Sequence, residues 1–247
     1  MIIDNTMATP FLCQPIQYGA DIVVHSTTKF LSGHGNAMGG AIVDSGTFDW
    51  GQNDKYPSLA QPEEAYHGLN FYESFGDLAY TTYGHAVGLR DLGPTMAPMN
   101  AYLTIMGVET LALRMEKHVA NAEVVANYLH NHDKVSWVSY AGLEESKYFH
   151  LAKKYLPKGA GSVFTFGIKG GYDAGVEFVE KCQLLSHLAN IGDTRSLVLH
   201  PASTTHRQLT ETQRISAGAG DDVIRLSIGL ETVEDIICLL YTSDAAD

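Results

Sequence analysis

Short apolar runs separated by turn-forming residues dominate the first third of the chain. Residues 2–4 and 22–25 are apolar runs that end in polar side chains, and a further run lies at residues 40–43 between glycines. Runs of this length predict buried β-strands. Strands joined by compact segments predict an α/β fold with a mostly parallel sheet. The segment 47–98 is aromatic and irregular, and helix is expected near residues 74–90.

The hydrophobic pattern changes to helical spacing after residue 100. Apolar residues then recur every three or four positions up to residue 130, which predicts one long helix bent near Gly107. A second amphipathic helix is predicted over 176–188, and Thr-Val-Glu-Asp at 232–235 has the pattern of a helix start. Strands are predicted at 134–140, 161–170, 196–200 and 223–231. We therefore expect a smaller α+β domain beginning near Glu116.

The composition is that of an acidic globular protein. Of 247 residues, 45% are hydrophobic, which supports a sizeable core in one or two domains. The net charge of −12 disfavours nucleic acid or an anionic membrane as partner. We expect no membrane span, because no run of about 18 apolar residues occurs. The three distant cysteines and the absence of a signal-peptide pattern predict a cytoplasmic protein.

Both ends of the sequence are atypical. Ile2 and Ile3 have the composition of a buried strand that nothing precedes, which suggests that the natural sequence extends upstream. Residues 238–247, Cys-Leu-Leu-Tyr-Thr-Ser-Asp-Ala-Ala-Asp, resemble a translated sequencing adapter. We interpret these ten residues as a non-native tail.

The segment "HSTTKFLSGHG" places Lys29 where a strand runs out into a glycine-rich loop. A lysine becomes a nucleophile when it is partly desolvated or lies beside positive charge. Ser26 and Thr28 could hold an anion beside it. Asp4 ends the preceding strand, and adjacent parallel strands place their carboxyl ends together, where α/β sheets bind ligands. Each of these residues also has an ordinary explanation as a surface or turn residue.

Two other types of site are disfavoured by the same segment. His34 could be a metal ligand, but no partner stands at metal-ligand spacing, so no metal site is predicted. The glycines around it lack the spacing of a phosphate-binding P-loop, and we interpret them as tight turns.

The triplet "DNT" followed by "DIVVHSTTKFLSGHG" resembles the signature of the pyridoxal-phosphate (PLP) enzymes of cysteine and methionine metabolism, the transsulfuration family. The segments "APMNAYLTIMGVETLALRMEKH", "LANIGDTRSLVLHPASTTH" and "IRLSIGLE" extend the resemblance over residues 2–237. The insert "YHGLNFYESFGDLAY" and the segment "YLPKGAGSVFTFGIKGG" are most similar to the O-acetylhomoserine sulfhydrylase branch.

The resemblance implies a fold type I PLP-dependent transferase, of which this chain is a part. Residues 1–115 would form the C-terminal part of the PLP-binding large domain, and residues 116–237 the small C-terminal domain. Lys29 would bind PLP as a Schiff base, and Asp4 would pair with its pyridinium nitrogen.

The resemblance also implies roles for four further residues. Ser26 and Thr28 would hold the cofactor's phosphate. Arg225 would bind the substrate's α-carboxylate through its planar fork, and Asn190 would lie near that carboxylate. His200 and His206 are expected to support the site without taking part in the chemistry.

The implied reaction is γ-replacement on O-acetyl-L-homoserine by sulfide or a thiol, which yields homocysteine or methionine and acetate, in a homo-oligomer of the tetramer-of-dimers type. A cystathionine γ-synthase and a γ-lyase of the same family are the alternatives. A third is an inactive truncated chain, because the family's phosphate cradle, ring-stacking aromatic residue and neighbouring-subunit groups would lie upstream. A phosphate-loop binding module is disfavoured.

Overall fold

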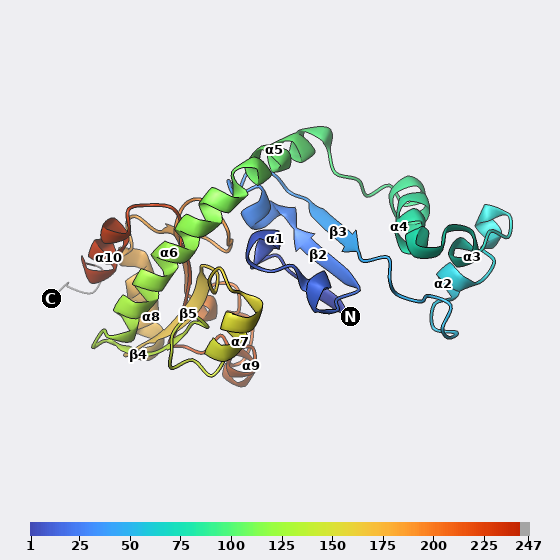
Figure 1. The fold of residues 1–247 in the computed structure, drawn as a ribbon. Coiled ribbons are helices and arrows are strands. Elements are labelled where there is room, and N and C mark those ends of the chain that lie inside the picture. Colours follow the sequence, from blue (N-terminus) through green and yellow to red (C-terminus); the bar gives the residue numbers. More distant parts are fainter. Residues whose placement is uncertain (243–247) are drawn as a thin grey trace.

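The computed structural model describes residues 1–242 and contains two β-sheets joined by a long helix (Figure 1). The first sheet is formed by β1 (Ile2–Asp4), β2 (Ile22–Ser26) and β3 (Gly40–Asp44), in that order. β1 and β2 are parallel, as expected, whereas β3 pairs antiparallel with β2. The α/β fold class is confirmed, and the described part of this sheet is mixed. Two short proline-containing segments connect β1 to β2, namely α1 (Thr9–Leu12) and the 3-10 turn η1 (Pro15–Tyr18).

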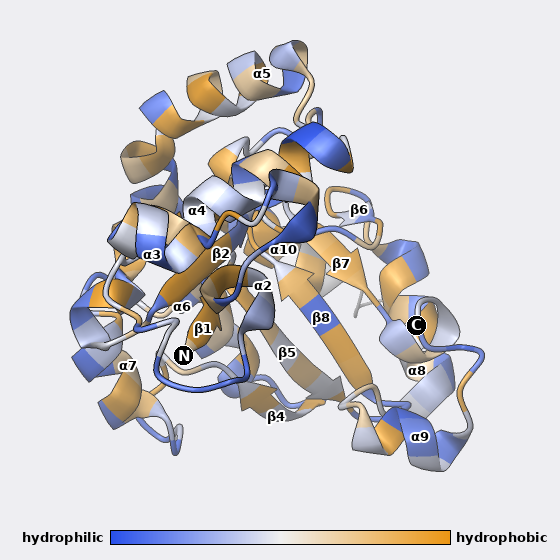
Figure 2. Ribbon diagram, turned by 90° about the vertical axis from the view of Figure 1, so that its right-hand side faces the viewer, coloured by the Kyte–Doolittle hydropathy of each residue, from blue (hydrophilic) through white to orange (hydrophobic). Residues whose placement is uncertain are grey.

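The second sheet has five strands in the order β4-β5-β8-β7-β6. All neighbouring pairs are antiparallel except β6 and β7, which agrees with the α+β pattern expected for this half. The strands appear in Figure 2 as mostly apolar ribbons, and Phe166, Ile224 and Leu226 are at most 1% exposed. Their bounds are β4 (Val135–Ser139), β5 (Val163–Ile168), β6 (Ser186–His187), β7 (Leu197–Leu199) and β8 (Val223–Ser227).

The helix predicted over residues 100–130 is present as two helices. α5 (Pro98–Glu109) and α6 (Leu111–His130) meet at Thr110, three residues after the predicted bend. Gly107 has a different role, because a Cβ there would lie 2.3 Å from the Ser32 carbonyl oxygen. The glycine therefore lets α5 cross the backbone that follows Lys29 at close range.

Residues 47–91 form an arm that extends from β3 away from the second sheet (Figure 1). The helix expected near 74–90 is a run of short helical segments. Aromatic side chains hold the arm together, with the Trp50 and Tyr80 rings stacked at 5.3 Å. The segments are α2 (Pro57–Ala60), η3 (Glu64–Tyr66), α3 (Phe71–Phe75), η4 (Gly76–Leu78), α4 (Ala79–Tyr83) and η5 (Gly84–Asp91).

The amphipathic helix predicted over 176–188 lies earlier in the chain, as α8 (Gly171–Lys181). Leu185 is buried as its periodicity suggested, but it packs from the connection to β6. The apolar residues after Lys181 keep helical spacing in the sequence, although they lie in the loops before and after the short strand β6. α7 (Phe149–Tyr155) and α9 (Glu211–Ser216) were not predicted from the sequence.

The last described helix is α10 (Val233–Thr242), which begins where the capping pattern predicted. Leu240 is 3% exposed and belongs to the core of the second sheet. Residues 243–247, half of the predicted non-native tail, lie outside the described residues, and the tail assignment stays a prediction. Within residues 1–242, no helix has the length and hydropathy needed to cross a bilayer.

Candidate active site

The carboxyl ends of β1 and β2 lie side by side, because Asp4 pairs with Val24 in a parallel register. Thr6 connects the two ends. Its backbone N–H donates to Asp4 Oδ1 at 2.9 Å, and its hydroxyl oxygen accepts from the Ser26 backbone N–H at 2.8 Å. Hydrogen bonds from Thr6 lower the pKa of Asp4, and the nearby His25 adds to the effect. Asp4 is therefore held as a carboxylate at the end of its strand.

Lys29 lies in a helical turn, Thr27–Leu31, that follows β2 directly. Its φ of −91° and ψ of −129° depart from helical values and interrupt the turn. The turn is closed by hydrogen bonds from Ser32 N to Thr27 O at 3.0 Å and from Gly33 N to Lys29 O at 2.8 Å. The Lys29 side chain is half-buried and leaves the turn toward the second sheet, where its amine has its hydrogen-bond partner.

The two hydroxyls predicted to bind an anion differ in their surroundings. Ser26 Oγ has no hydrogen-bond partner among residues 1–242. Thr28 Oγ1 accepts from Gly39 N at 3.1 Å and lies 3.4 Å from Gly39 O. The Ser26 hydroxyl is thus available to a ligand, whereas that of Thr28 also fastens the glycine loop to the turn.

Lys29, Asn190 and Arg225 are joined by hydrogen bonds, although Lys29 follows β2 of the first sheet, Asn190 lies in the loop between β6 and β7, and Arg225 lies in β8 of the second sheet. Lys29 Nζ donates to Asn190 Oδ1 at 2.5 Å, and an Arg225 Nη donates to the Asn190 backbone carbonyl at 3.2 Å. Burial lowers the pKa of Lys29, and the positive charge of Arg225 lowers it further. Burial also lowers the pKa of Arg225, which lies in β8 opposite Thr165 and Leu199.

Close backbone contact explains how the loop at 190–194 reaches Lys29. Gly192 has φ +73°, and a Cβ there would lie 2.6 Å from Phe30 N. Its N–H donates to Ser227 Oγ at 3.0 Å, and Thr194 N donates to Gly33 O at 2.8 Å. This contact was not predicted from the sequence, in which Gly33 and Gly192 were the available signal.

Five of the six predicted site residues thus form two hydrogen-bonded groups, and the sixth, Thr28, bonds to Gly39. Asp4 and Ser26 are linked through Thr6, and Lys29, Asn190 and Arg225 are linked directly. Such a set offers an amine of lowered pKa, a carboxylate, a free hydroxyl and a half-buried guanidinium. This chemistry suits a carbonyl compound that also carries acidic groups.

The two predicted supporting histidines have side-chain hydrogen-bond partners other than the six site residues. His200 is buried, with its two ring nitrogens 2.9 Å from Ser203 Oγ and from the Asp221 carbonyl. His206 is exposed and contacts Thr205. The hydrogen bonds of His200 therefore hold the connection between β7 and β8, whereas the role of His206 stays a prediction. No group of three metal-binding side chains occurs in the part of the chain that the structure describes.

A family model described as "Cys/Met metabolism PLP-dependent enzyme" matches residues 1–243. An O-acetyl-L-homoserine sulfhydrylase of Leptospira meyeri is 49% identical over 246 residues, covering 96% of this chain and 55% of the relative. A homocysteine synthase of Schizosaccharomyces pombe is 49% identical over 239 residues, covering 96% and 56%. The chain therefore spans about half the length of the curated relatives it matches.

Solved structures give the same relationship. The structure of a Campylobacter jejuni protein assigned as an O-acetylhomoserine (thiol)-lyase, which contains pyridoxyl-lysine-5'-monophosphate, has a TM-score of 0.94 and 42% identity. The match covers 99% of the present chain and 58% of the Campylobacter jejuni chain. A cystathionine γ-synthase of Xanthomonas oryzae has a TM-score of 0.77 and 32% identity, over 98% and 54%.

Proposed function

The chain belongs to the Cys/Met metabolism PLP-dependent enzymes, and we propose that it carries the reaction centre of an enzyme that replaces the acetoxy group of O-acetyl-L-homoserine. The incoming group is sulfide or a thiol, and the products are homocysteine or methionine and acetate. The convergence of Lys29, Asn190 and Arg225 carries the proposal. It places a nucleophilic amine next to a group that suits the carboxylate of an amino-acid substrate.

The side chains at the strand ends fit the family's cofactor. Asp4, whose pKa is lowered, suits a protonated ring nitrogen, and the Ser26 hydroxyl, which has no partner among residues 1–242, suits a phosphate oxygen. Thr28 would share its hydroxyl between the phosphate and Gly39. Lys29 supplies the amine that bonds the cofactor's aldehyde carbon. When bound, PLP provides an electron sink for the substrate's α-carbon.

Lys29 is proposed to move protons as well as to hold the cofactor. Burial and Arg225 lower its pKa, so more of its Nζ is unprotonated than in an exposed lysine. In this form Nζ accepts the proton from the substrate's α-carbon and then serves as the general acid and base for the following transfers. Asn190 Oδ1 holds Nζ in place between these steps.

Arg225 is proposed to bind the substrate's α-carboxylate. The guanidinium uses one Nη on the Asn190 carbonyl and retains its other donors for a bidentate contact. Because the side chain is half-buried, this contact is only partly screened by water. Asn190 therefore sets the spacing between the amine that reacts and the guanidinium that anchors the substrate.

The first test is covalent trapping on the chain itself. We expect PLP followed by borohydride to leave a pyridoxyl group on Lys29, located by peptide mass spectrometry. Lys29→Ala should lose the label, whereas the control Lys154→Ala, an exposed lysine, should keep it. A label that survives Lys29→Ala at the same stoichiometry would contradict the assignment.

The second test separates the sulfhydrylase from a cystathionine γ-synthase, the alternative with 32% identity. In a protein of the relatives' length that contains this chain, acetate release from O-acetylhomoserine should be supported by sulfide more than by cysteine. Preference for cysteine would favour the alternative. The higher TM-score of the O-acetylhomoserine (thiol)-lyase structure supports the first outcome.

We also propose that residues 1–115 belong to the cofactor-binding domain and residues 116–237 to the small domain. The two separate sheets support this division, and helix α6 spans the boundary between the two domains.

A homo-oligomer is supported by α5, on which Met99, Tyr102 and Ile105 are 65%, 56% and 59% exposed. Light scattering on the parent and on Tyr102→Lys tests this, and equal masses would count against it. A cytoplasmic location is proposed from the composition.

A further inference from the structure

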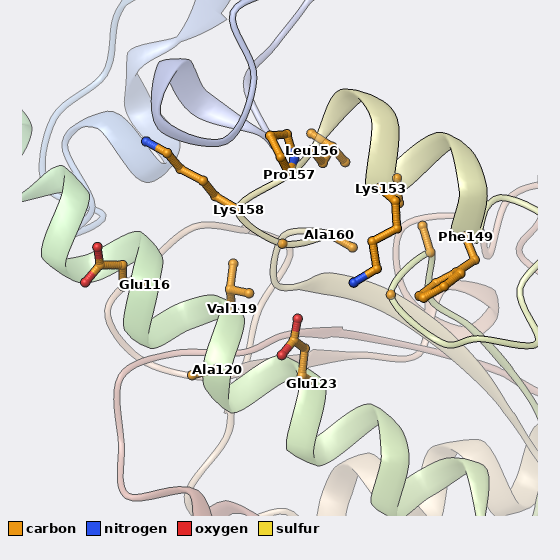
Figure 3. Close-up of a pocket in the computed structure, with 14 residues that line it drawn as sticks. Glu116, Val119, Ala120, Glu123, Phe149, Lys153, Leu156, Pro157, Lys158 and Ala160 are labelled. Carbon is orange, nitrogen blue, oxygen red and sulfur yellow. The ribbon is translucent and has the colours of Figure 1, made fainter.

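A cavity of about 360 Å³ opens between α6, α7 and the loop that follows α7 (Figure 3). Val119 and Ala120 of α6 form one wall, and Phe149 and Leu156 line the opposite side. None of the residues assigned to the Lys29 site lines it. Its volume lies at the lower end of the range for small-molecule sites, about 300 to 1,000 Å³. The cavity is therefore separate from the Lys29 site and large enough for a small metabolite.

Opposite charges face this cavity from its two walls. Figure 3 shows the Glu123 carboxylate on α6 and the Lys153 amine on α7 pointing toward the space between them. The two groups form no ion pair within 4.0 Å in the described part of the chain. The Lys153 Nζ atom instead lies over the Phe149 ring, 5.0 Å from its centre. Each charge is thus available to a ligand that enters.

The other two charged residues of the lining are less available. Lys158 turns away from the cavity, with its amine 4.1 Å from the centre of the Phe11 ring. Glu116 lies at the far end of the same wall as Glu123, two turns of α6 away. The charged part of the site is therefore Glu123 opposite Lys153.

Backbone contacts hold the cavity in shape. Gly159 has φ +119°, and a Cβ there would lie 2.3 Å from a Val119 methyl group, so this loop rests directly on α6. Leu156 N donates to Ala152 O at 2.8 Å, and Gly159 N donates to Leu156 O at 3.0 Å. A ligand would therefore enter a site that is already formed, at a low cost in ordering.

We propose that this cavity binds the zwitterion of a free α-amino acid with an unbranched apolar side chain. The α-ammonium and α-carboxylate groups are carried by one carbon, so a single molecule bridges two protein charges that do not reach each other. The ammonium group contacts Glu123 and the carboxylate group contacts Lys153. The side chain lies on Val119, Leu156 and the Phe149 ring, where apolar area leaves water.

L-Norleucine is the probe, titrated into the chain by isothermal calorimetry. Hexanoate lacks its ammonium group and pentylamine lacks its carboxylate group, so each should bind at least about threefold more weakly, as expected for loss of one partly exposed ion pair. If either analogue binds as tightly as norleucine, or if norleucine produces no heat, the zwitterion assignment is wrong.

Variants locate the site. Glu123→Gln and Lys153→Gln should each weaken norleucine binding by about threefold to fivefold. The controls Glu144→Gln and Lys147→Gln, exposed charges outside the cavity, should bind like the parent. Circular dichroism checks that each variant is folded. Parent-like affinity of both cavity variants would overturn the proposal.

A further variant separates this cavity from the proposed substrate site. Arg225→Leu should retain norleucine binding, because Arg225 does not line the cavity. If Arg225→Leu abolishes binding while Glu123→Gln does not, the amino acid binds at the Lys29 site. Trapping of PLP on Lys29 is read independently, so failure of either proposal is recognised by itself.

Discussion

His118 is fully buried, and its ionisation should couple the stability of the chain to pH. Its ring packs edge-on against Phe30 with the ring centres 5.2 Å apart. Nδ1 lies 2.6 Å from the Ile228 carbonyl, while Nε2 has no partner among residues 1–242. Burial lowers the pKa of His118 from 6.5 to about 4, with a smaller contribution from Arg114.

The sign of the effect follows from proton uptake. As pH falls from 6.5 to 4, the unfolded chain takes up a proton at His118 and the folded chain does not. The stability contributed by the neutral ring is therefore complete above pH 6.5 and is lost as pH falls toward 4. With about 1.36 kcal/mol per pKa unit, the free energy of unfolding should fall by about 2 kcal/mol between pH 7.5 and pH 5 from this residue.

Urea unfolding of the parent and of His118→Gln, followed by circular dichroism at pH 7.5, 6 and 5, measures this loss. The variant should be less stable at pH 7.5, because the packing on Phe30 is lost. The difference in unfolding free energy between parent and variant should shrink by about 2 kcal/mol at pH 5. Only the parent loses stability there, because only its unfolded chain takes up a proton at residue 118. His150→Gln, which removes an exposed histidine, is the control. A difference that does not change with pH would refute the reasoning.

Two further predictions concern the segment that carries Lys29. Gly107→Ala should lower the free energy of unfolding by about 1 to 3 kcal/mol, because its Cβ would overlap the Ser32 backbone, whereas Gly88→Ala, with nothing within 4 Å, should not. Urea unfolding of both variants measures this, and equal midpoints would contradict it. Asn190→Asp should raise the pKa of Lys29 by placing an anion beside Nζ. The pH at which PLP trapping is half-complete should then rise, and an unchanged profile would show that the contact has no electrostatic effect.

The sequence predicted secondary structure well where packing and local pattern agree. The end predicted for the long helix, residue 130, agrees with the end of α6 at His130. The agreement arises because the apolar face of α6 is buried along most of the helix. The pattern at 176–188 misled because Leu185 is buried from a loop, and periodicity does not distinguish a loop residue from a helical one. The antiparallel pairing of β3 depends on where the chain returns in space, which local patterns do not contain.

The candidate site also has a part that the sequence predicted and a part that it did not. The neighbourhood of Asp4 and the strand before Lys29 was predictable, since parallel strands align their carboxyl ends. The direct contact between Lys29 and Asn190 was not, because the two residues are 161 positions apart. The family resemblance implied that Lys29 would bind the cofactor and that Asn190 would lie near the substrate's carboxylate, but the hydrogen bond between the two residues is visible only in the folded chain. How Thr6 connects Asp4 to Ser26 likewise emerged only from the strand register.

One face of α6 determines how far Lys29 lies from Arg225. Arg114 donates to the carbonyls of Phe30 at 2.8 Å and Gly107 at 2.7 Å, which fixes the turn that carries Lys29.

Farther along the same helix, the His118 ring meets the Ile228 carbonyl and Asn121 donates to Gly229 O at 3.0 Å, just beyond the end of the strand that carries Arg225. These side chains are buried and polar, so they lie where hydrophobic spacing alone would predict only core. Leaving a buried carbonyl without its donor costs about 1 to 3 kcal/mol, so the helix is held to both segments at once. The distance between the Lys29 amine and the Arg225 guanidinium is therefore set by a helix that contributes neither group. A substitution at Asn121 should change this distance, although Asn121 hydrogen-bonds to neither residue.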